Sequence, residues 1–293
     1  MSDEESILSE VFKALPPSSA VVPTGDDACV LAPRGNVVAS TDILVENVHF
    51  RRDWSSGADV GWRVVAQNVA DAVAMGARPR SILIAVTVPP EIGADWLNDF
   101  TRGAADACTT LSRTPIGIDG GDIARGQIVV ACGTIMGDLD GREPVLRSGA
   151  RPGHILAHCG HLGRSAHGYS ILESGGDGGD ADLFRRPVPP TEVALAARPA
   201  AMMDVSDGLL RDAKRMAGAS SVRFLLDRDA IDSLRSPGVT MEMALSGGED
   251  HGFLAAVEAV PPGWTRIGRV EEGAGVFLDD TEISELGGWD HFA

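Results

Sequence analysis

The stretch Asn68-Val69-Ala70-Asp71-Ala72-Val73-Ala74-Met75-Gly76-Ala77 gives the first indication of the fold. It ends a longer segment, 58–75, in which apolar residues recur at helical spacing until Gly76. We therefore expect a helix over these residues, with Asn68 and Asp71 one turn apart on the same face. Since an unpaired carboxylate is costly to bury, Asp71 is expected to face water, an ionic partner or a metal ion.

Strand-like and helical segments alternate on both sides of this helix. Strands are predicted at 37–39, 81–88, 127–136, 222–227 and 253–260, and further helices at 94–111, 165–172 and 207–217. Ser206 is a favourable N-cap for the last of these helices. The alternation predicts an α/β (α+β mixed) fold. The polar, Gly-flanked segment 137–141 predicts a boundary between two domains, residues 1–138 and 139–293.

The composition narrows the class of protein. With 42 acidic and 25 basic residues, the formal charge of −17 repels phosphate backbones and anionic lipids, so we expect neither a nucleic-acid nor a membrane partner. The four cysteines form no C-x-x-C pair, as is typical of a reducing compartment. The acidic N-terminus gives no indication of a signal peptide. We therefore expect a cytoplasmic protein.

Several polar clusters fall at the expected ends of elements. They are Gly25-Asp26-Asp27, Ser40-Thr41-Asp42, Asn68 with Asp71, Asp119-Gly120-Gly121-Asp122, Asp204-Val205-Ser206-Asp207-Gly208 and Ser246-Gly247-Gly248-Glu249-Asp250. Any one of them is more often a simple turn, because Gly permits positive φ and Asp caps its own backbone. Together they supply many hard oxygen ligands, which suit Mg²⁺ better than Zn²⁺.

A zinc site is the rival interpretation of a histidine-rich segment. His154, His158, Cys159, His161 and His167 lie close together in the sequence. Their spacing matches no standard zinc pattern, so surface or loop positions are favoured. Segment 160–168 is instead expected to be a backbone-rich loop that approaches phosphate.

The familiar nucleotide-binding signatures are missing from the sequence. There is no G-x-x-x-x-G-K-[ST], no G-x-G-x-x-G after the first expected strand, and no kinase-type H-R-D or D-F-G motif. A bound nucleotide would therefore depend on metal ions, arginine and backbone N–H groups to hold its phosphates.

In order along the chain, these clusters resemble those of the thiamine-monophosphate kinase family. The resemblance also includes His49-Phe50, Arg147-Ser148-Gly149-Ala150 and Gly288-Trp289-Asp290-His291-Phe292, and it extends over nearly the whole chain. The Asn68–Ala77 stretch is similar to the wider aminoimidazole ribonucleotide synthetase-like superfamily. More specific to the thiamine-phosphate branch are Ser40-Thr41-Asp42 with His49, Asp204–Gly208 and the terminal Trp-Asp-His-Phe.

The resemblance implies a two-domain aminoimidazole ribonucleotide synthetase-like fold. The N-terminal domain would bind ATP and Mg²⁺ and pair its sheet across a homodimer, and the C-terminal α/β domain would close the active-site cleft. The implied reaction is direct in-line transfer of a phosphoryl group from ATP to thiamine phosphate, which gives thiamine diphosphate.

The resemblance also implies residue roles. Metal ligands would be Asp27, Ser40, Thr41, Asp42, Asp71, Asp122, Asp204 and Asp207, of which Asp42, Asp71 and Asp122 are the catalytic candidates. The nucleotide would contact Gly121, Asp122, Arg147 and Ser206. Thiamine phosphate would contact His49, Glu249 and Trp289, with the indole facing a cationic or aromatic ring.

The sequence departs from the family pattern at three positions. Ile123 stands where a Thr or Ser usually follows the Gly-Gly-Asp, Asp119 adds a carboxylate, and His251 replaces the usual aromatic residue.

Two alternatives to this function stay open. One is another ATP-dependent enzyme of the superfamily, of the selenophosphate or purine-pathway synthetase type, although the first cysteine is Cys29, after the Asp-Asp turn. The other is a non-catalytic metal- or nucleotide-binding protein, which would bind nucleotide without turnover.

Overall fold

The computed structural model describes residues 11–25 and 27–283. The contacts divide the chain into two compact units. The first comprises the chain up to Val73 together with Ala77–Arg142, and the second comprises Ala74–Gly76 and the chain from Glu143 onward. Over the described residues, no helix is both long and apolar enough to span a lipid bilayer.

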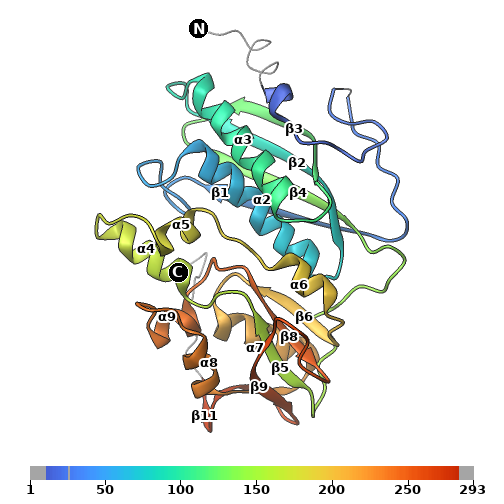
Figure 1. The fold of residues 1–293 in the computed structure, drawn as a ribbon, viewed down its shortest axis with the longest axis vertical. Coiled ribbons are helices and arrows are strands. Elements are labelled where there is room, and N and C mark those ends of the chain that lie inside the picture. Colours follow the sequence, from blue (N-terminus) through green and yellow to red (C-terminus); the bar gives the residue numbers. More distant parts are fainter. Residues whose placement is uncertain (1–10, 26, 284–293) are drawn as a thin grey trace. The chain divides into compact units, whose positions relative to one another are not determined.

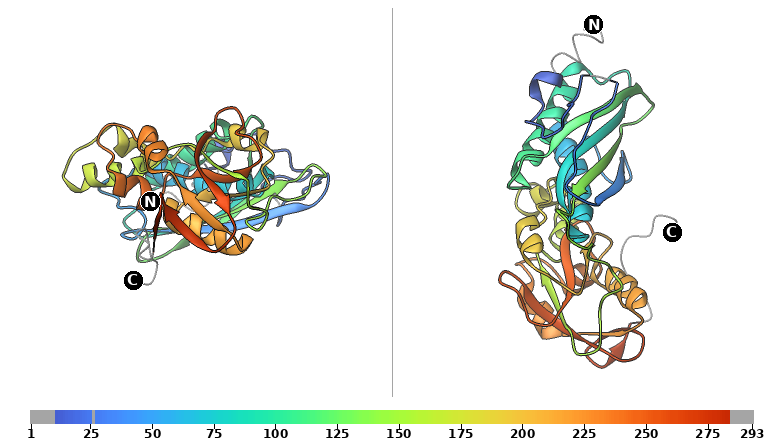
Figure 2. Two further views of the ribbon diagram at one scale, coloured as in Figure 1. Left: turned by 90° about the horizontal axis from the view of Figure 1, so that it is seen from below. Right: turned by 90° about the vertical axis from the view of Figure 1, so that its right-hand side faces the viewer.

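The first unit is a four-stranded sheet with two helices on one face (Figures 1 and 2). Its elements are β1 (Val37–Val45), α2 (Gly57–Ala74), β2 (Arg78–Val88), α3 (Ala94–Thr110), β3 (Gly117–Arg125) and β4 (Val130–Asp138). The strand order is β1-β4-β2-β3, and only β2 and β3 run parallel. Strands β1 and β3 are therefore the edges of this sheet.

The helical pattern of the sequence becomes the packing surface of α2. Val64, Val65, Val69 and Val73 are fully buried. This confirms the predicted helix over 58–75 to within one residue at each end. On the sheet side, the alternating residues of β2 likewise form a packing surface, with Ile82 fully buried.

Helices α2 and α3 approach each other through glycines. A Cβ on Gly61 would lie 2.0 Å from the carbonyl oxygen of Phe100, and one on Gly103 would lie 1.9 Å from that of Ala58. Any larger side chain at either position would push the helices apart, so these glycines set the interhelical distance.

Two polar clusters that we expected at the ends of elements lie inside strands instead. Ser40-Thr41-Asp42 is in the middle of β1, which continues to Val45, and residues 119–122 are part of β3. The prediction of a strand ending at 39 was therefore wrong, and β3 was missed. Period-two patterns are hidden when small and polar residues occupy a strand that is exposed on one side.

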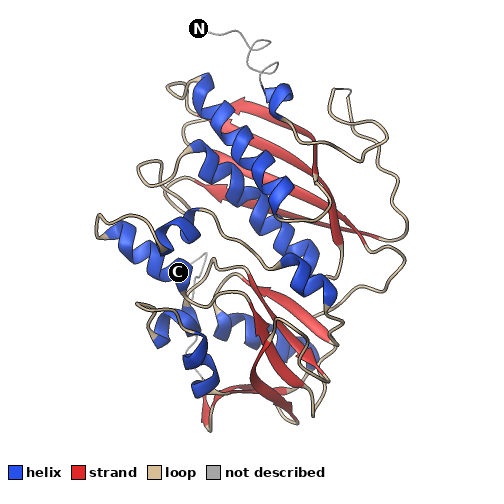
Figure 3. Cartoon of the chain, in the orientation of Figure 1, coloured by secondary structure: helices blue, strands red, loops and turns tan. Residues whose placement is uncertain are grey.

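The second unit contains a seven-stranded mixed sheet (Figure 3). Its strands are β5 (Ile155–Cys159), β6 (Ala201–Val205), β7 (Arg223–Leu226), β8 (Gly252–Val257), β9 (Thr265–Glu271), β10 (Gly275–Leu278) and β11 (Thr281–Glu282). The order is β11-β10-β7-β9-β5-β8-β6. Its helices are α4 (Arg164–Glu173), α5 (Asp180–Arg185), α6 (Thr191–Ala196), α7 (Leu209–Ser220), α8 (Arg228–Leu234) and α9 (Met241–Ser246).

The core of this unit lies between α7 and the sheet. Leu209, Ala213 and Met216 on the helix are fully buried in one cluster with Phe224 and Leu254 on the strands. Because β5, β6 and β8 are buried on both faces, they show no alternation in the sequence, and β5 and β6 were not predicted.

Two local expectations in this unit need correction. Helix α7 starts at Leu209 behind Gly208, whose φ is 106°, so Ser206 is not its N-cap. Segment 160–168 is not a continuous loop, because α4 starts at Arg164.

Candidate functional site

The contact between Ser40 and Asp71 is the centre of the candidate site in the first unit. Oγ of Ser40 in β1 donates a hydrogen bond of 2.6 Å to Oδ2 of Asp71 on α2. Both side chains are partly exposed, so the carboxylate keeps access to solvent. The polar positions at which the helical pattern of α2 is interrupted thus meet the polar positions of the strand beneath.

Asn68 lies one turn before Asp71 and is completely buried. Its amide nitrogen donates to the carbonyl oxygen of Val64 at 2.8 Å, and its Oδ1 has no hydrogen-bond partner among the described atoms. A Cβ on Gly133 would lie 2.5 Å from that amide nitrogen, so the asparagine fits only above a glycine of β4.

The pleat of β1 separates the Ser40-Thr41-Asp42 triplet. Ser40 is opposite the buried Ile135, and Asp42 is opposite Gly133, beneath Asn68. Thr41 points to the other face. Its hydroxyl donates to the carbonyl oxygen of Gly133 at 2.8 Å and lies 3.0 Å from the hydroxyl of Thr134. The structure therefore groups Ser40 and Asp42 with α2 and turns the side chain of Thr41 away.

Strand β3 carries the predicted nucleotide residues Gly121 and Asp122. A Cβ on Gly121 would lie 1.9 Å from the carbonyl oxygen of Ile84, so the neighbouring strand requires a glycine here. Asp122 is exposed, and its Oδ1 accepts a hydrogen bond from the N–H of Ile123 at 2.9 Å. Asp27 is exposed in the loop before β1.

The donor set around Asp71 fits Mg²⁺. Ser40, Asp42 and Asp71 offer hydroxyl and carboxylate oxygens, the hard ligands that this ion prefers. Among the described residues, no group of three or more His, Cys, Asp or Glu side chains could hold a metal ion by itself. Mg²⁺ usually takes one or two carboxylates and completes its shell with water and substrate phosphates.

In the second unit, Asp204 lies in β6, and Ser206 and Asp207 lie between β6 and α7. The buried carboxylate of Asp212 accepts hydrogen bonds from the N–H groups of Ser206 at 3.1 Å and Asp207 at 3.0 Å. Arg215 contacts both Asp212 at 2.7 Å and Asp207 at 2.5 Å. Burial, with the nearby charge of Asp204, raises the pKa of Asp212 to about 7. Asp212 and Arg215 were missed from the sequence, although they lie on consecutive turns of one helix face.

The segment between α9 and β8 forms the other side of this cluster. Glu249 and His251 have φ values of 69° and 51°, left-handed conformations that are costly for such residues. Between them, the buried carboxylate of Asp250 accepts hydrogen bonds from the N–H groups of Gly163 and Ser165 at the start of α4. His251 is buried, with Nδ1 3.6 Å from Oδ2 of Asp204 and Nε2 3.4 Å from Oε2 of Glu249.

The remaining predicted site residues are dispersed. His49 lies in the turn after β1, and its Nδ1 accepts a hydrogen bond from the N–H of Val45 at 3.0 Å. Arg147 is exposed before β5, and its carbonyl oxygen accepts a hydrogen bond from Ser220 at 2.7 Å. Trp289 lies outside the described residues.

The histidine-rich segment does not form a metal site within the described residues. His158 is buried in β5, and burial lowers its pKa to about 3. His167 instead contacts the carboxylate of Asp180 at 2.8 Å, and Arg164 contacts the same carboxylate. These contacts hold α4 and α5 together.

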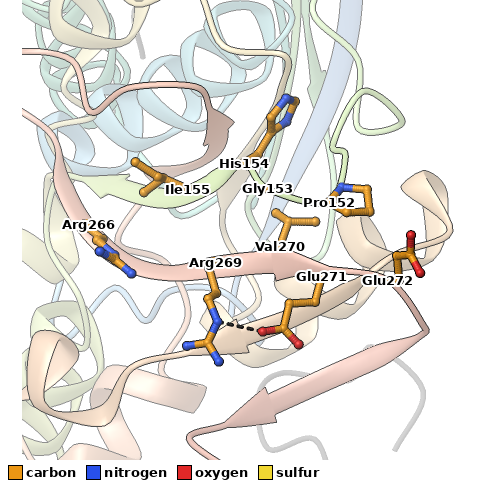
Figure 4. Close-up of a pocket in the computed structure, with 9 residues that line it drawn as sticks. All are labelled: Pro152, Gly153, His154, Ile155, Arg266, Arg269, Val270, Glu271 and Glu272. Carbon is orange, nitrogen blue, oxygen red and sulfur yellow. Dashed lines mark hydrogen bonds and ion pairs between the residues drawn. The ribbon is translucent and has the colours of Figure 1, made fainter.

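A pocket of about 560 Å³ lies elsewhere in the second unit (Figure 4). His154, Arg266 and Arg269 are among the residues that line it, and Arg269 contacts Glu271 at 2.7 Å. None of the predicted site residues that the structure describes lines this pocket.

Comparison with known proteins assigns the chain to a family. Residues 25–138 match the AIR synthase related protein N-terminal domain, and residues 151–280 match the corresponding C-terminal domain. Thiamine-monophosphate kinase of Mycobacterium tuberculosis is 42% identical over 94% of this chain and 87% of that protein. This chain belongs to the thiamine-monophosphate kinase family.

Two solved structures of the family have the same fold. AaThiL complexed with AMPPCP and TMP superposes with a TM-score of 0.80 at 29% identity and covers 91% of each chain. Thiamine-monophosphate kinase from Stenotrophomonas maltophilia gives a TM-score of 0.80 at 28% identity, over 95% of this chain and 96% of that one. The predicted two-domain aminoimidazole ribonucleotide synthetase-like fold is thereby confirmed, and both domains of the family are present.

Proposed function

We propose that this protein transfers the terminal phosphoryl group of ATP to thiamine phosphate and so forms thiamine diphosphate. The observation that carries the proposal is the match over 91% of both chains to AaThiL complexed with AMPPCP and TMP. It is supported by the identity of 42% to a thiamine-monophosphate kinase.

Mg²⁺ would be held at the Ser40–Asp71 contact together with Asp42. The hydrogen bond from Ser40 fixes the orientation of the Asp71 carboxylate. Asp27, Thr41 and Asp122 in the first unit and Asp204 and Asp207 in the second remain candidate ligands. When bound, the ion would neutralise phosphate charge, which an acidic protein must do before it can bind two phosphate-bearing substrates.

The nucleotide would be bound by residues that keep backbone or cationic groups accessible. Gly121 of β3 approaches Ile84 so closely that no side chain fits at this position, which leaves only backbone there. Asp122, the next residue, is exposed. Arg147 is exposed and can offer a charge-assisted contact to phosphate. Ser206 is fixed through its N–H by Asp212.

Thiamine phosphate would be bound by His49 and Glu249, with Trp289 as a further predicted contact. Because Nδ1 of His49 accepts a hydrogen bond from Val45, the neutral ring carries its proton on Nε2 and donates from that atom, as a phosphate ligand must. Glu249 would offer a carboxylate to the cationic part of the acceptor.

The reaction is a direct in-line transfer. An oxygen of the acceptor phosphate forms a bond to the γ-phosphorus of ATP as the bond to the β-γ bridging oxygen breaks, and ADP leaves. The acceptor phosphate is largely dianionic at neutral pH, since its second pKa is about 6, so its oxygen attacks without first losing a proton to the protein. Alignment and charge neutralisation are then the main tasks of the side chains.

The homodimer and the cytoplasmic location are parts of the same proposal. Strand β1 is an edge of its sheet, and Val37 and Ile43 on it are each about half exposed. An edge strand with exposed apolar side chains suits pairing with a second copy. The cytoplasmic location agrees with the nature of the substrates, which are water-soluble anions.

A panel of acceptors tests the proposal. The protein is incubated with ATP and Mg²⁺ and, in turn, thiamine phosphate, thiamine or no acceptor, and the release of ADP is followed. ADP release that requires thiamine phosphate supports the proposal. ADP release at the same rate with water alone would contradict it and favour a different acceptor.

A further inference from the structure

His251 occupies an unusual place at the candidate acceptor site. It is only 4% exposed, yet it lies between two carboxylates of different elements, Asp204 on β6 and Glu249 before β8. Both ring nitrogens face an anionic oxygen at ion-pair distance, 3.6 and 3.4 Å, and neither makes a hydrogen bond within the described residues, so the buried ring depends on these two carboxylates.

The two carboxylates differ in how strongly the protein holds them. Asp204 has a short side chain on a buried strand, and 5% of it is exposed, so the backbone already determines its position. The side chain of Glu249 is longer and 31% exposed. The contact with His251 therefore restricts Glu249 much more than Asp204.

The local backbone is built to bring this contact about. Asp250 anchors the segment through the N–H groups of Gly163 and Ser165, and the hydroxyl of Ser165 donates to the carbonyl oxygen of Glu249 at 2.9 Å. With the backbone fixed on both sides of Asp250, the left-handed conformations of Glu249 and His251 direct their side chains toward each other. Backbone strain of this kind is commonly retained at functional sites.

We propose that His251 is a positioning residue that is held by Asp204 and orients the carboxylate of Glu249 for the cationic part of thiamine phosphate. The assignment of Glu249 to the acceptor rests on the proposed function. In such an arrangement one residue, here Asp204, fixes the ring of a histidine, and the histidine in turn fixes the group that binds or reacts, here Glu249. His251 itself need not touch the substrate.

The test combines His251→Gln and Glu249→Gln in a double-mutant cycle, with His154→Gln as the matched control. Dissociation constants for thiamine phosphate and for ATP with Mg²⁺ are measured by calorimetry, and KM and kcat are measured for each substrate. His251→Gln is expected to weaken thiamine phosphate binding about 10-fold, in the range found for residues that position a ligand. It should change ATP binding less than about twofold, and in the Glu249→Gln background it should add little.

An equal loss of affinity for both substrates, or an undiminished effect of His251→Gln in the Glu249→Gln background, would overturn the proposal. If His251→Gln does not fold, Glu249→Gln alone and the crystal structure of the wild-type protein decide. Glu249→Gln is expected to fold and to lose affinity for thiamine phosphate, while a wild-type crystal with the Glu249 carboxylate turned away from His251 would reject the assignment.

The failure of the proposed function would look different. Wild-type protein that binds no thiamine phosphate would refute the function. The crystal structure of His251→Gln would then still test the positioning role, because a Glu249 carboxylate that stays in place without the imidazole would show that His251 does not orient it.

Discussion

Ser40 and Asp71 are 31 residues apart in the chain, yet the hydroxyl of one donates a 2.6 Å hydrogen bond to the carboxylate of the other. The bond joins the middle of an edge strand to the last turn of a buried helix. It fixes the orientation of a carboxylate that is partly exposed, and the pleat of β1 puts Asp42 on the same face of the sheet as Ser40.

Asp71→Asn and Asp42→Asn are each expected to lower kcat at least about 100-fold, the scale on which loss of an electrostatic contact to a transition state acts. The amide keeps the size of the carboxylate but removes the charge that would hold Mg²⁺. Steady-state kinetics measure the effect, and the melting temperature should stay within a few degrees. The exposed helical Asp106→Asn is the control and should behave as wild type. Normal turnover in Asp71→Asn would remove this carboxylate from the mechanism.

Gly61→Ala is expected to destabilise the protein by about 1–3 kcal/mol or more, because its Cβ would lie 2.0 Å from a backbone oxygen of α3. Gly218→Ala is the matched control on another helix, since nothing lies within 4 Å of a Cβ there. It should stabilise by about 0.4–1 kcal/mol. Chemical unfolding measures both free energies. Equal values for the two variants would show that α2 and α3 are not packed as described.

Asp250→Ala is expected to cost about 2–4 kcal/mol, since it leaves the buried N–H groups of Gly163 and Ser165 without an acceptor. Asp250→Asn should cost less, because its side-chain oxygen can still accept from one of them. Hydrogen exchange should show faster exchange of these two amides in the alanine variant. Unchanged protection would mean that the carboxylate does not hold the start of α4.

His158 should make the stability depend on pH. Burial, with the nearby His161, lowers its folded-state pKa to about 3, below the value of about 6.5 in an unfolded chain. Between these values the unfolded state binds a proton that the folded state does not, so stability falls as the pH falls below 6.5, by up to about 1.4 kcal/mol per pH unit.

The matching variant is His158→Asn, which cannot take up that proton. The difference in unfolding free energy between wild type and variant should shift in favour of the variant as the pH is lowered from 7 to 5. A difference that is the same at both pH values would show that His158 titrates normally in the folded protein.

The parts of the fold that follow hydrophobic periodicity could be predicted from the sequence. Helices α2 and α3 and strand β2 each present one apolar face or a continuous buried run. Strand β3 could not, because Asp119-Gly120-Gly121-Asp122 has the composition of a turn and becomes a strand only through pairing with β2. The short helices α8 and α9 were missed because their composition also does not indicate a regular element. Asp227 and Thr240 nevertheless cap them with side-chain oxygens.

The candidate site could be predicted in its residue types but not in its geometry. The clusters that contain Ser40, Asp71 and Asp204 were found because polar residues interrupted apolar patterns. The separation of Thr41 from Ser40 depends on strand β1 continuing past them, which the sequence did not indicate. Asp212 and His251 were missed as site residues because their roles arise from contacts across the fold, with the N–H groups of Ser206 and Asp207 for one and with two carboxylates for the other.

The most direct test is the transfer of labelled phosphate from [γ-³²P]ATP to thiamine phosphate by the wild-type protein and Asp71→Asn, with Mg²⁺ or with EDTA. The account predicts labelled thiamine diphosphate from the wild type with Mg²⁺, none with EDTA, and almost none from Asp71→Asn. The account would be contradicted if the wild-type protein bound ATP in the presence of Mg²⁺ but left the ATP intact and the thiamine phosphate unlabelled, so that no labelled thiamine diphosphate formed.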